Sequence, residues 1–301
     1  MTQHEPRPPI CDYEGSNYRT EFWEGRGRGY EDRVERIALG RLLPPHGRRL
    51  LEIGAGFGRL TDEYDAFGQV VLLDYSLSQL QYAQEHLGRS TRFVYVAADA
   101  YHLPFHPGVF DGATMVRVLH HMASVDVVLT QVRRVLAPSG VFVLEHANKR
   151  NLKAMFRHLL KHQGWNPYDL APVEFVELNF DFHPEHIRRE LQQAGFIVQT
   201  RLSVSLFRLE RLKETMPLDL LTALDSLFQL SGLLYAPSVF VRSLAVGNTP
   251  DNLNRDILFA CPECGGELAR QGDTVSCLRE GLRWAIRDGI YDFKAPLEGD
   301  E

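Results

Sequence analysis

The sequence reads Leu50-Leu-Glu-Ile-Gly-Ala-Gly-Phe-Gly-Arg-Leu60 at the point where an apolar run meets three alternating glycines. The run contains one acid, Glu52, and the glycines are Gly54, Gly56 and Gly58. This pattern predicts a buried strand that ends in a tight turn at the N-terminus of a helix. In a doubly wound sheet, such a turn binds a nucleotide-like ligand.

Apolar runs and amphipathic segments alternate after this turn. The predicted strands are Leu50–Ile53, Val70–Leu73, Phe93–Ala97, Gly112–Val116 and Val141–Leu144, and later Phe196–Val204 and Ser238–Val246. Helices lie between them, one capped by Ser78 and ended by Gly88, and another capped by Ser124. Buried strands that alternate with such helices predict an α/β fold with a doubly wound, mostly parallel sheet.

The overall composition limits the class of partner. Of the 301 residues 44% are hydrophobic, which is enough for one large α/β domain with a small appendage. The net charge of −6 gives no basic footprint for general nucleic-acid binding. The N-terminal Met1–Pro9 is too polar for a signal peptide, and the uncharged Ser226–Val241 is too short to span a bilayer. We therefore expect a cytoplasmic protein without a transmembrane segment.

The spacing of the glycines distinguishes between two nucleotide-like ligands. A dinucleotide fingerprint would require glycine at Arg59, whereas this chain has its third glycine one residue earlier and an acid, Glu52, two residues before the first. The resulting Glu-x-Gly-x-Gly-x-Gly pattern resembles the first motif of class I S-adenosylmethionine-dependent methyltransferases. Asp74 ends the second predicted strand 22 residues after Glu52, near the offset expected for an acid that accepts ribose hydroxyls, and Tyr75 follows it.

Three further stretches carry the same resemblance in the expected order. They are Ala98-Asp99-Ala100, the run from Phe110 to His121, and Arg134-Val-Leu-Ala-Pro-Ser-Gly140. The resemblance covers about residues 48–246 and implies a seven-stranded sheet with an antiparallel last strand. It also implies S-adenosylmethionine as cofactor, held by Glu52, Gly54, Ala55, Gly56, Gly58, Asp74, Tyr75, Asp99, Ala100 and Arg117.

Groups that could assist methyl transfer should follow the fourth and fifth strands, at the carboxyl edge of the sheet. His120 and His121 follow the fourth strand, and Glu145 and His146 follow the fifth. A histidine can remove a proton near neutral pH when the acceptor requires it. We take His121 and Glu145 as the catalytic candidates and expect His120 to pack or to contact the cofactor.

Two segments outside the motifs bear on what approaches the site. Residues 1–44 are expected to form a lid, in which Arg26-Gly-Arg-Gly-Tyr30 is either a closing loop or a solvated linker. Lys149–Gln163 has apolar residues at helical spacing and a separate ladder of basic residues. This helix could contact an anionic membrane through Lys149–Trp165, cover an anionic substrate, or be a surface helix with a solvated basic face.

A cysteine-bearing module is expected at residues 255–297. Cys261-Pro-Glu-Cys264-Gly-Gly resembles one knuckle of a zinc ribbon, and Cys277 with Glu280 stands where the second pair is expected. The module is either a zinc site with these four ligands or a ribbon held by its own apolar core. It resembles the small zinc-ribbon family that accompanies some tRNA and translation-factor methyltransferases.

The sequence therefore predicts an N-terminal segment at 1–44, a methyltransferase domain at 45–247 with helical insertions at 149–182 and 209–234, and the module. The first hypothesis for the acceptor is a small or lipid-like molecule. The second is RNA (tRNA or rRNA) or a translation factor recognised by the module, although residues 255–301 hold six basic and ten acidic residues, which disfavours phosphate binding. The third is a scaffold that binds cofactor without catalysis.

Overall fold

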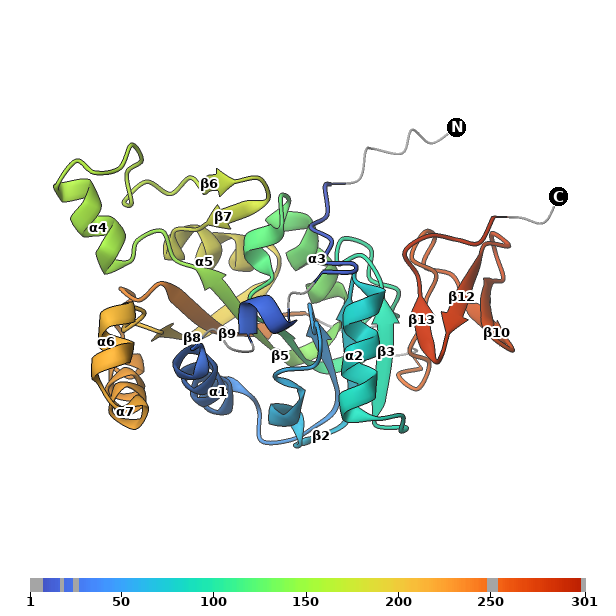
Figure 1. Cartoon of the computed structure of the whole chain (residues 1–301). Helices are drawn as coiled ribbons and strands as arrows, with labels where there is room; N and C mark the ends of the chain where they lie inside the picture. The colour runs from blue at the N-terminus through green and yellow to red at the C-terminus, as the bar shows by residue number, and fades with distance from the viewer. Residues whose placement is uncertain (1–7, 17–18, 24–26, 248–253, 299–301) are drawn as a thin grey trace.

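A computed structural model describes residues 8–16, 19–23, 27–247 and 254–298. Eleven strands form one sheet in the order β10-β11-β12-β13-β3-β2-β1-β4-β5-β9-β8 (Figure 1). Their bounds are Gly47–Ile53 (β1), Phe67–Asp74 (β2), Phe93–Ala97 (β3), Phe110–Met115 (β4), Leu136–Ala147 (β5), Phe196–Val204 (β8), Ser238–Ala245 (β9), Leu268–Gln271 (β10), Thr274–Cys277 (β11), Arg283–Arg287 (β12) and Ile290–Asp292 (β13).

The middle of this sheet confirms the predicted fold. Strands β3, β2, β1, β4 and β5 run parallel, β9 is antiparallel to β5, and β8 is antiparallel to β9. These are the seven strands that the sequence predicts, with Ser238–Ala245 as the antiparallel strand. The sheet is larger than predicted, because four strands of the C-terminal module extend it.

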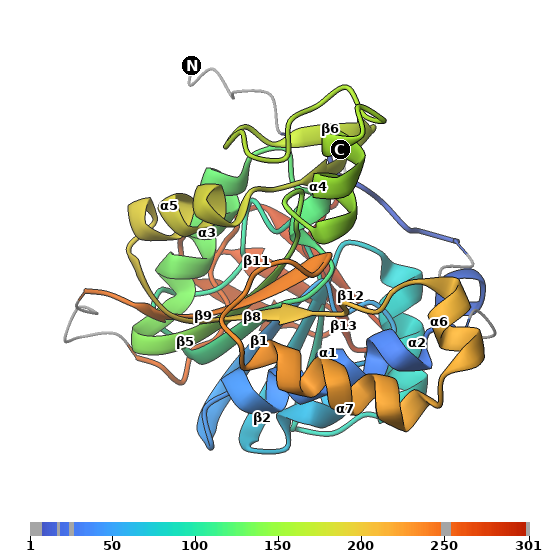
Figure 2. The ribbon, with the colours of Figure 1, turned by 90° about the vertical axis from the view of Figure 1, so that its left-hand side faces the viewer.

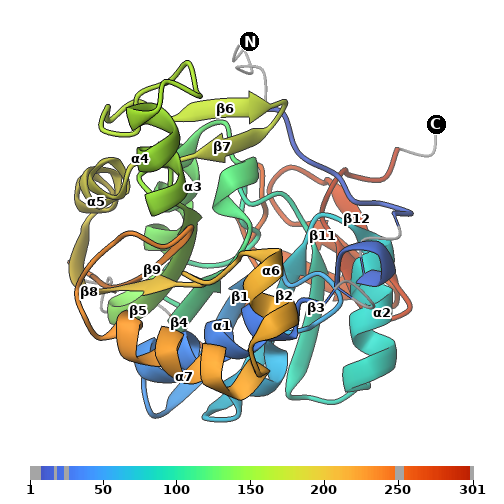
Figure 3. The same ribbon diagram turned by 60° about the vertical axis from the view of Figure 1, so that its left-hand side comes forward.

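Helices cover both faces of the sheet, and each face has its own apolar core (Figure 3). One core includes residues of α1 (Gly29–Leu42), α2 (Leu77–Leu87) and α7 (Leu218–Gln229). The other includes residues of α3 (Val125–Val135) and α5 (Pro184–Gln193). The shorter helices are η1 (Arg19–Trp23), η2 (Thr61–Tyr64), η3 (Leu119–His121), α4 (Leu152–Leu159) and α6 (Glu210–Thr215).

Local signals set the ends of several helices differently from the prediction. The cap of α2 is Ser76, whose hydroxyl accepts from the Gln79 amide, so Ser78 lies inside the helix. Ser124 precedes α3 as predicted but makes no side-chain cap. The predicted helix over Lys149–Gln163 is shorter, because Asn151 caps it at its start and Lys161 adopts a positive φ of 56°. Pro217 divides α6 from α7.

The two additions to the methyltransferase-like sheet lie at opposite ends of the molecule (Figure 1). After β5 the chain forms α4 and a separate hairpin of β6 (Val173–Val176) and β7 (Asn179–Asp181). At the other end, β13 of the C-terminal module pairs in parallel with β3, with Ile290 opposite Tyr95. Among the described residues, no helix is long and apolar enough to cross a membrane.

Candidate functional site

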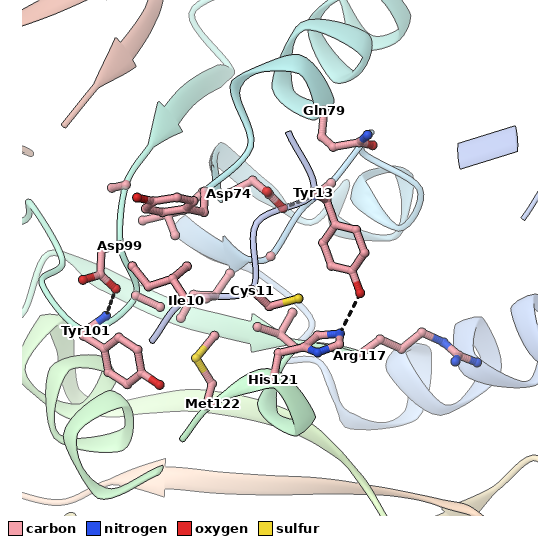
Figure 4. Close-up of a pocket in the computed structure, with 18 residues that line it drawn as sticks. Ile10, Cys11, Tyr13, Asp74, Gln79, Asp99, Tyr101, Arg117, His121 and Met122 are labelled. Carbon is pink, nitrogen blue, oxygen red and sulfur yellow. Dashed lines mark hydrogen bonds between the residues drawn. The ribbon is translucent and has the colours of Figure 1, made fainter. Parts of the chain in front are cut away.

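A cavity lies at the carboxyl ends of β1, β2 and β4 (Figure 4). Its walls combine apolar surface with the side chains of Asp74, Tyr75 and Asp99, all of which the motifs predict for the site. Ala100 and Arg117 also line it. The structure therefore brings residues from four predicted motifs to one cavity.

The glycine turn lies between this cavity and a second cavity, which is described below. Gly54 has φ of 70°, and a Cβ atom there would lie 2.0 Å from Cγ2 of Val118, so no other residue fits without rearrangement. The amides of Gly54 and Ala55 both donate to the carbonyl of Leu73, at 2.7 and 3.0 Å. A Cβ at Gly56 would meet no atom of the described residues within 4 Å, so they leave the backbone here open to a ligand.

Two carboxylates hold the ends of β2 and β3. Asp74 accepts from the Gly56 amide at 2.8 Å and from the Ser76 amide at 2.9 Å, which ties the glycine turn to the end of β2. Burial raises the pKa of Asp74, and the hydrogen bonds from these amides act against that rise. Asp99 accepts from the Tyr101 amide at 2.8 Å and pairs with Nδ1 of His102 at 2.9 Å.

Glu52 faces a second cavity on the other side of the turn. Ala55, Arg59 and Arg117 also line that cavity. The Glu52 carboxylate accepts from the Thr61 hydroxyl at 2.6 Å and from the Tyr64 hydroxyl at 3.3 Å. Burial raises the pKa of Glu52 to about 7, so a cationic ligand nearby would favour its charged form.

The N-terminal segment crosses the first cavity. Ile10, Cys11 and Tyr13 line it, and Glu14 fixes the segment by accepting from the Leu77 amide at the start of α2, at 2.6 Å. Cys11 thus lies at the cavity and is not part of the cluster of Cys261, Cys264 and Cys277. Of the Arg26–Tyr30 stretch, Arg26 lies outside the described residues, whereas the Tyr30 ring is buried and its hydroxyl donates to Asp225 at 2.7 Å.

His121 reaches the cavity wall from η3 (Figure 4). Its Nδ1 lies 2.9 Å from the Leu178 carbonyl, which can only accept, so Nδ1 carries the proton. Its Nε2 therefore accepts from the Tyr13 hydroxyl at 3.0 Å. Burial lowers the pKa of His121. His120 packs against it with ring centroids 4.0 Å apart, and burial lowers the pKa of His120 to about 3.

Glu145 does not line either cavity. One of its oxygens accepts from the Arg117 amide at 2.9 Å and the other from the Ser238 hydroxyl. Arg117 has a positive φ of 60°, so the buried carboxylate holds a strained backbone position at the end of β4. The geometry of Glu145 is that of a support behind the site.

Several residues near the site belong to none of the motifs that could be recognised in the sequence. Glu35 of α1 is fully buried and accepts from Nε of Arg117 at 2.9 Å and from Arg59 at 2.8 Å. Arg208 lies 3.9 Å from the same carboxylate, and its buried Nε has no hydrogen-bond partner among the residues that the structure describes. Asp181 of β7 has its pKa raised to about 6, first by burial and then by the charge of Glu145.

Three cysteines of the C-terminal module form a candidate metal centre. The sulfurs of Cys261, Cys264 and Cys277 all lie within 4.8 Å of one another. Tetrahedral zinc at about 2.3 Å from each sulfur places sulfurs about 3.8 Å apart, so the cluster has the right size. Glu280 is not brought into it: its carboxylate pairs with Arg279 at 3.3 Å, while its amide donates to the Cys277 sulfur.

Comparisons with known proteins agree with this geometry. Residues 51–144 match the family model described as a methyltransferase domain. The malonyl-[acyl-carrier protein] O-methyltransferase of Geobacter sulfurreducens is 32% identical over 49% of this chain and 55% of its own length. The ubiquinone/menaquinone biosynthesis C-methyltransferase of Vibrio parahaemolyticus is 29% identical over 50% of this chain and 64% of its own length. The chain thus spans a little over half the length of these relatives.

Solved structures support the fold. A chain from the complex of the Haloferax volcanii Trm112 methyltransferase activator with a methyltransferase has a TM-score of 0.52 at 17% identity, over 74% of this chain and 95% of that one. An S-adenosylmethionine-dependent methyltransferase from Listeria monocytogenes has a TM-score of 0.52 at 15% identity, over 73% of this chain and all of its own. Residues 51–144 of this chain thus match the methyltransferase-domain family model, and the chain around them shares the Rossmann-like fold of these solved structures.

Proposed function

We propose that the chain transfers a methyl group from S-adenosylmethionine to a small-molecule or lipid-like acceptor. The observation that carries this proposal is the pair of cavities on the two sides of the Gly54–Gly58 turn. The first has the acids and apolar surface suited to adenosine, and the second has Glu52 and Arg59 beside the turn, suited to an amino-acid tail. Bound there, the cofactor would supply an activated methyl group on a sulfonium.

The residues present fit this cofactor. The two oxygens of Asp74 accept from backbone amides, and the carboxylate keeps lone-pair capacity with which it can accept a ribose hydroxyl. Tyr75 and Ala100 offer apolar surface for the adenine ring. Glu52, with its raised pKa, would be drawn into its charged form by the ammonium or sulfonium charge.

The relatives support the reaction type. Their names include one O-methyltransferase and one C-methyltransferase, so they favour methyl transfer and not one particular acceptor atom. On the acceptor side, we propose that His121, Asp181 and Arg208 supply the polar groups. His121 lines the first cavity, where a ligand could replace the Tyr13 hydroxyl at its Nε2, and the buried Nε of Arg208 has no hydrogen-bond partner among the described residues. Asp181 is a half-buried acid that feels the charge of Glu145 behind the site.

Replacing Asp74 by alanine tests the cofactor assignment. We expect the affinity for S-adenosylhomocysteine to fall by one to two orders of magnitude, because charge-assisted hydrogen bonds to the ribose are lost. Isothermal calorimetry on the purified protein measures this directly. The control is Asp126→Ala on α3, outside both cavities, which should bind like the unaltered protein. Unchanged affinity in the Asp74 variant would overturn the assignment of Asp74 to the cofactor site, and no binding by the unaltered chain would overturn S-adenosylmethionine as the cofactor.

We further propose that the C-terminal module supports the cofactor site. The pairing of β13 with β3 continues the sheet next to the strand that leads to Asp99. Nζ of Lys294 lies 5.3 Å from the centre of the Tyr75 ring, so the module reaches the cavity wall. Its excess of acidic residues weighs against RNA as the acceptor.

We also propose that the three cysteines bind a zinc ion. Its fourth coordination position would be taken by water, or by Glu280 once that side chain leaves Arg279. We expect purified protein to contain about one zinc ion per chain and to lose it on the substitution Cys264→Ser. Metal analysis by mass spectrometry measures the content. Cys11→Ser is a matched control, because that thiol lines the first cavity and is not part of the cysteine cluster, so its loss should leave the zinc in place. Metal-free protein with an intact fold would show a ribbon held by its apolar core alone.

A further inference from the structure

Helix α4 turns its apolar face away from the protein. Its contact with the rest of the chain is made on the side of Ala154, which is buried. Leu152, Phe156, Leu159 and Leu160 share the other side, at i, i+4, i+7 and i+8, and the last three are 62, 75 and 59% exposed. An apolar stripe of this size on a protruding helix needs a partner, because soluble surfaces rarely expose one.

Basic residues flank this stripe. Lys153 and Arg157 stand at i and i+4 on α4 beside the apolar side chains, Lys161 follows just after the helix, and all three are exposed. From Asn148 to Tyr168 the chain has five basic residues and no acidic one, although its net charge is −6. The partner of this face is therefore expected to be anionic as well as apolar.

A second apolar stripe lies on the same side of the molecule. Leu220, Leu224 and Leu227 of α7 are exposed at i, i+4 and i+7, and Leu230 and Leu233 continue the exposed surface beyond the helix. Figure 2 shows α4 and α7 on the side that faces the viewer. A backbone hydrogen bond joins the start of α4 to the segment that follows α7, because the Leu152 amide donates to the Tyr235 carbonyl at 2.9 Å.

We propose that α4 docks this side of the protein on a bilayer that contains anionic phospholipids. The leucine and phenylalanine side chains would enter the boundary between headgroups and acyl chains, and the three basic side chains would lie among the phosphates. Each apolar side chain buried and each basic side chain near an anionic surface adds to binding. A helix of eight residues suits this arrangement, because it lies in the surface and does not cross it.

The docking face adjoins the acceptor side of the candidate site. The chain runs from α4 into the β6–β7 hairpin, where the Leu178 carbonyl accepts from His121. An acceptor dissolved in the bilayer would then reach the site from the docked side. This last step rests on the proposed methyl transfer, whereas docking itself does not and is measured without cofactor.

The test is sedimentation of the full chain with vesicles of phosphatidylcholine, with or without about one third phosphatidylglycerol. We expect binding to the anionic vesicles that weakens as salt is raised. The double variant Lys153→Gln/Arg157→Gln should lower the partition coefficient about thirtyfold. Phe156→Glu/Leu159→Glu should lower it about a hundredfold or more. All four side chains are exposed, so these variants should fold, which circular dichroism verifies.

Matched controls lie on the opposite end of the molecule. Arg89→Gln/Arg270→Gln removes the same charge, and Ile257→Glu/Leu278→Glu adds the same acids at exposed apolar positions, and both should bind like the unaltered protein. Three results would overturn the proposal. These are no binding to anionic vesicles, equal weakening in variants and controls, or a dimer by light scattering that the α4 variants dissociate, which would make this face a contact between two copies.

Discussion

Replacing Glu35 by alanine is expected to lower the free energy of unfolding by about 3–5 kcal/mol. The side chain is fully buried and its two oxygens accept from Arg117 and Arg59, with Arg208 at 3.9 Å. Removing the carboxylate would take the charge of Glu35 away from the half-buried Arg117 and Arg208, while Arg59 keeps Asp32. Urea unfolding at pH 7, followed by circular dichroism, measures the difference.

The same carboxylate predicts a pH dependence. Burial alone would raise the pKa of Glu35, but Arg117 and Arg59 outweigh it and hold the pKa below its ordinary value of 4.5. A pKa that is lower in the folded than in the unfolded chain gives stability that is present above about pH 4.5. This stability is lost as the pH falls through the folded-state value, so the unaltered protein should lose more stability on acidification than Glu35→Gln.

A surface carboxylate provides the control for Glu35. Glu185 of α5 pairs with Arg188 at the helix surface, and Glu185→Ala should cost at most about 1 kcal/mol because solvent screens such a pair. If Glu35→Ala lowered the free energy of unfolding no more than Glu185→Ala does, the buried cluster would not hold α1 against the site. If cofactor affinity also fell in the Glu35 variant, the cluster would be shown to position Arg117.

The cofactor half of the site was accessible from the sequence, because its chemistry lies at strand ends that follow one another in order. Gly54 and Asp74 are close in the chain to the strands that position them, and local patterns reveal such residues. The partners of Arg117 were not accessible in this way. Glu35 and Arg208 come from α1 and from the segment after β8, and only the folded sheet brings them to one point.

Two other features show why periodicity alone was insufficient. The stripe that includes Phe156 and Leu159 has the spacing of a helix that packs on a core, yet the structure exposes it. Spacing shows which residues share a face of the helix, but not whether that face contacts the protein or the solvent. Likewise, the β12–β13 run reads as a small separate ribbon. Its last strand instead pairs with β3, across almost 200 residues of chain, and no local signal encodes that pairing.

The second large effect is a loss of methyl-transfer rate, expected when His121 on the acceptor side of the site is replaced. Replacing His121 by glutamine is expected to lower the rate of methyl transfer by about a hundredfold or more, if the acceptor loses a proton to its Nε2. The neutral ring with its proton on Nδ1 is the form that can accept a proton, and the Leu178 carbonyl holds it in that form. Because burial lowers the pKa of His121 below 6.5, the base stays unprotonated in mildly acidic solution. Activity of the unaltered protein should therefore persist below pH 6.5.

The control for His121 is Tyr13→Phe, which removes the hydroxyl that donates to Nε2 but leaves the ring in place. A base would be freed by that change, so Tyr13→Phe should retain activity while His121→Gln loses it. The assay is release of S-adenosylhomocysteine with a lipid and small-molecule extract as the source of acceptor, and cofactor affinity is measured alongside by calorimetry. Equal loss in both variants would mean that the Tyr13–His121 hydrogen bond closes the N-terminal segment over the cavity. Full activity in His121→Gln would dismiss the histidine as a base, and Asp181, whose pKa is raised to about 6, would then be the side chain to replace.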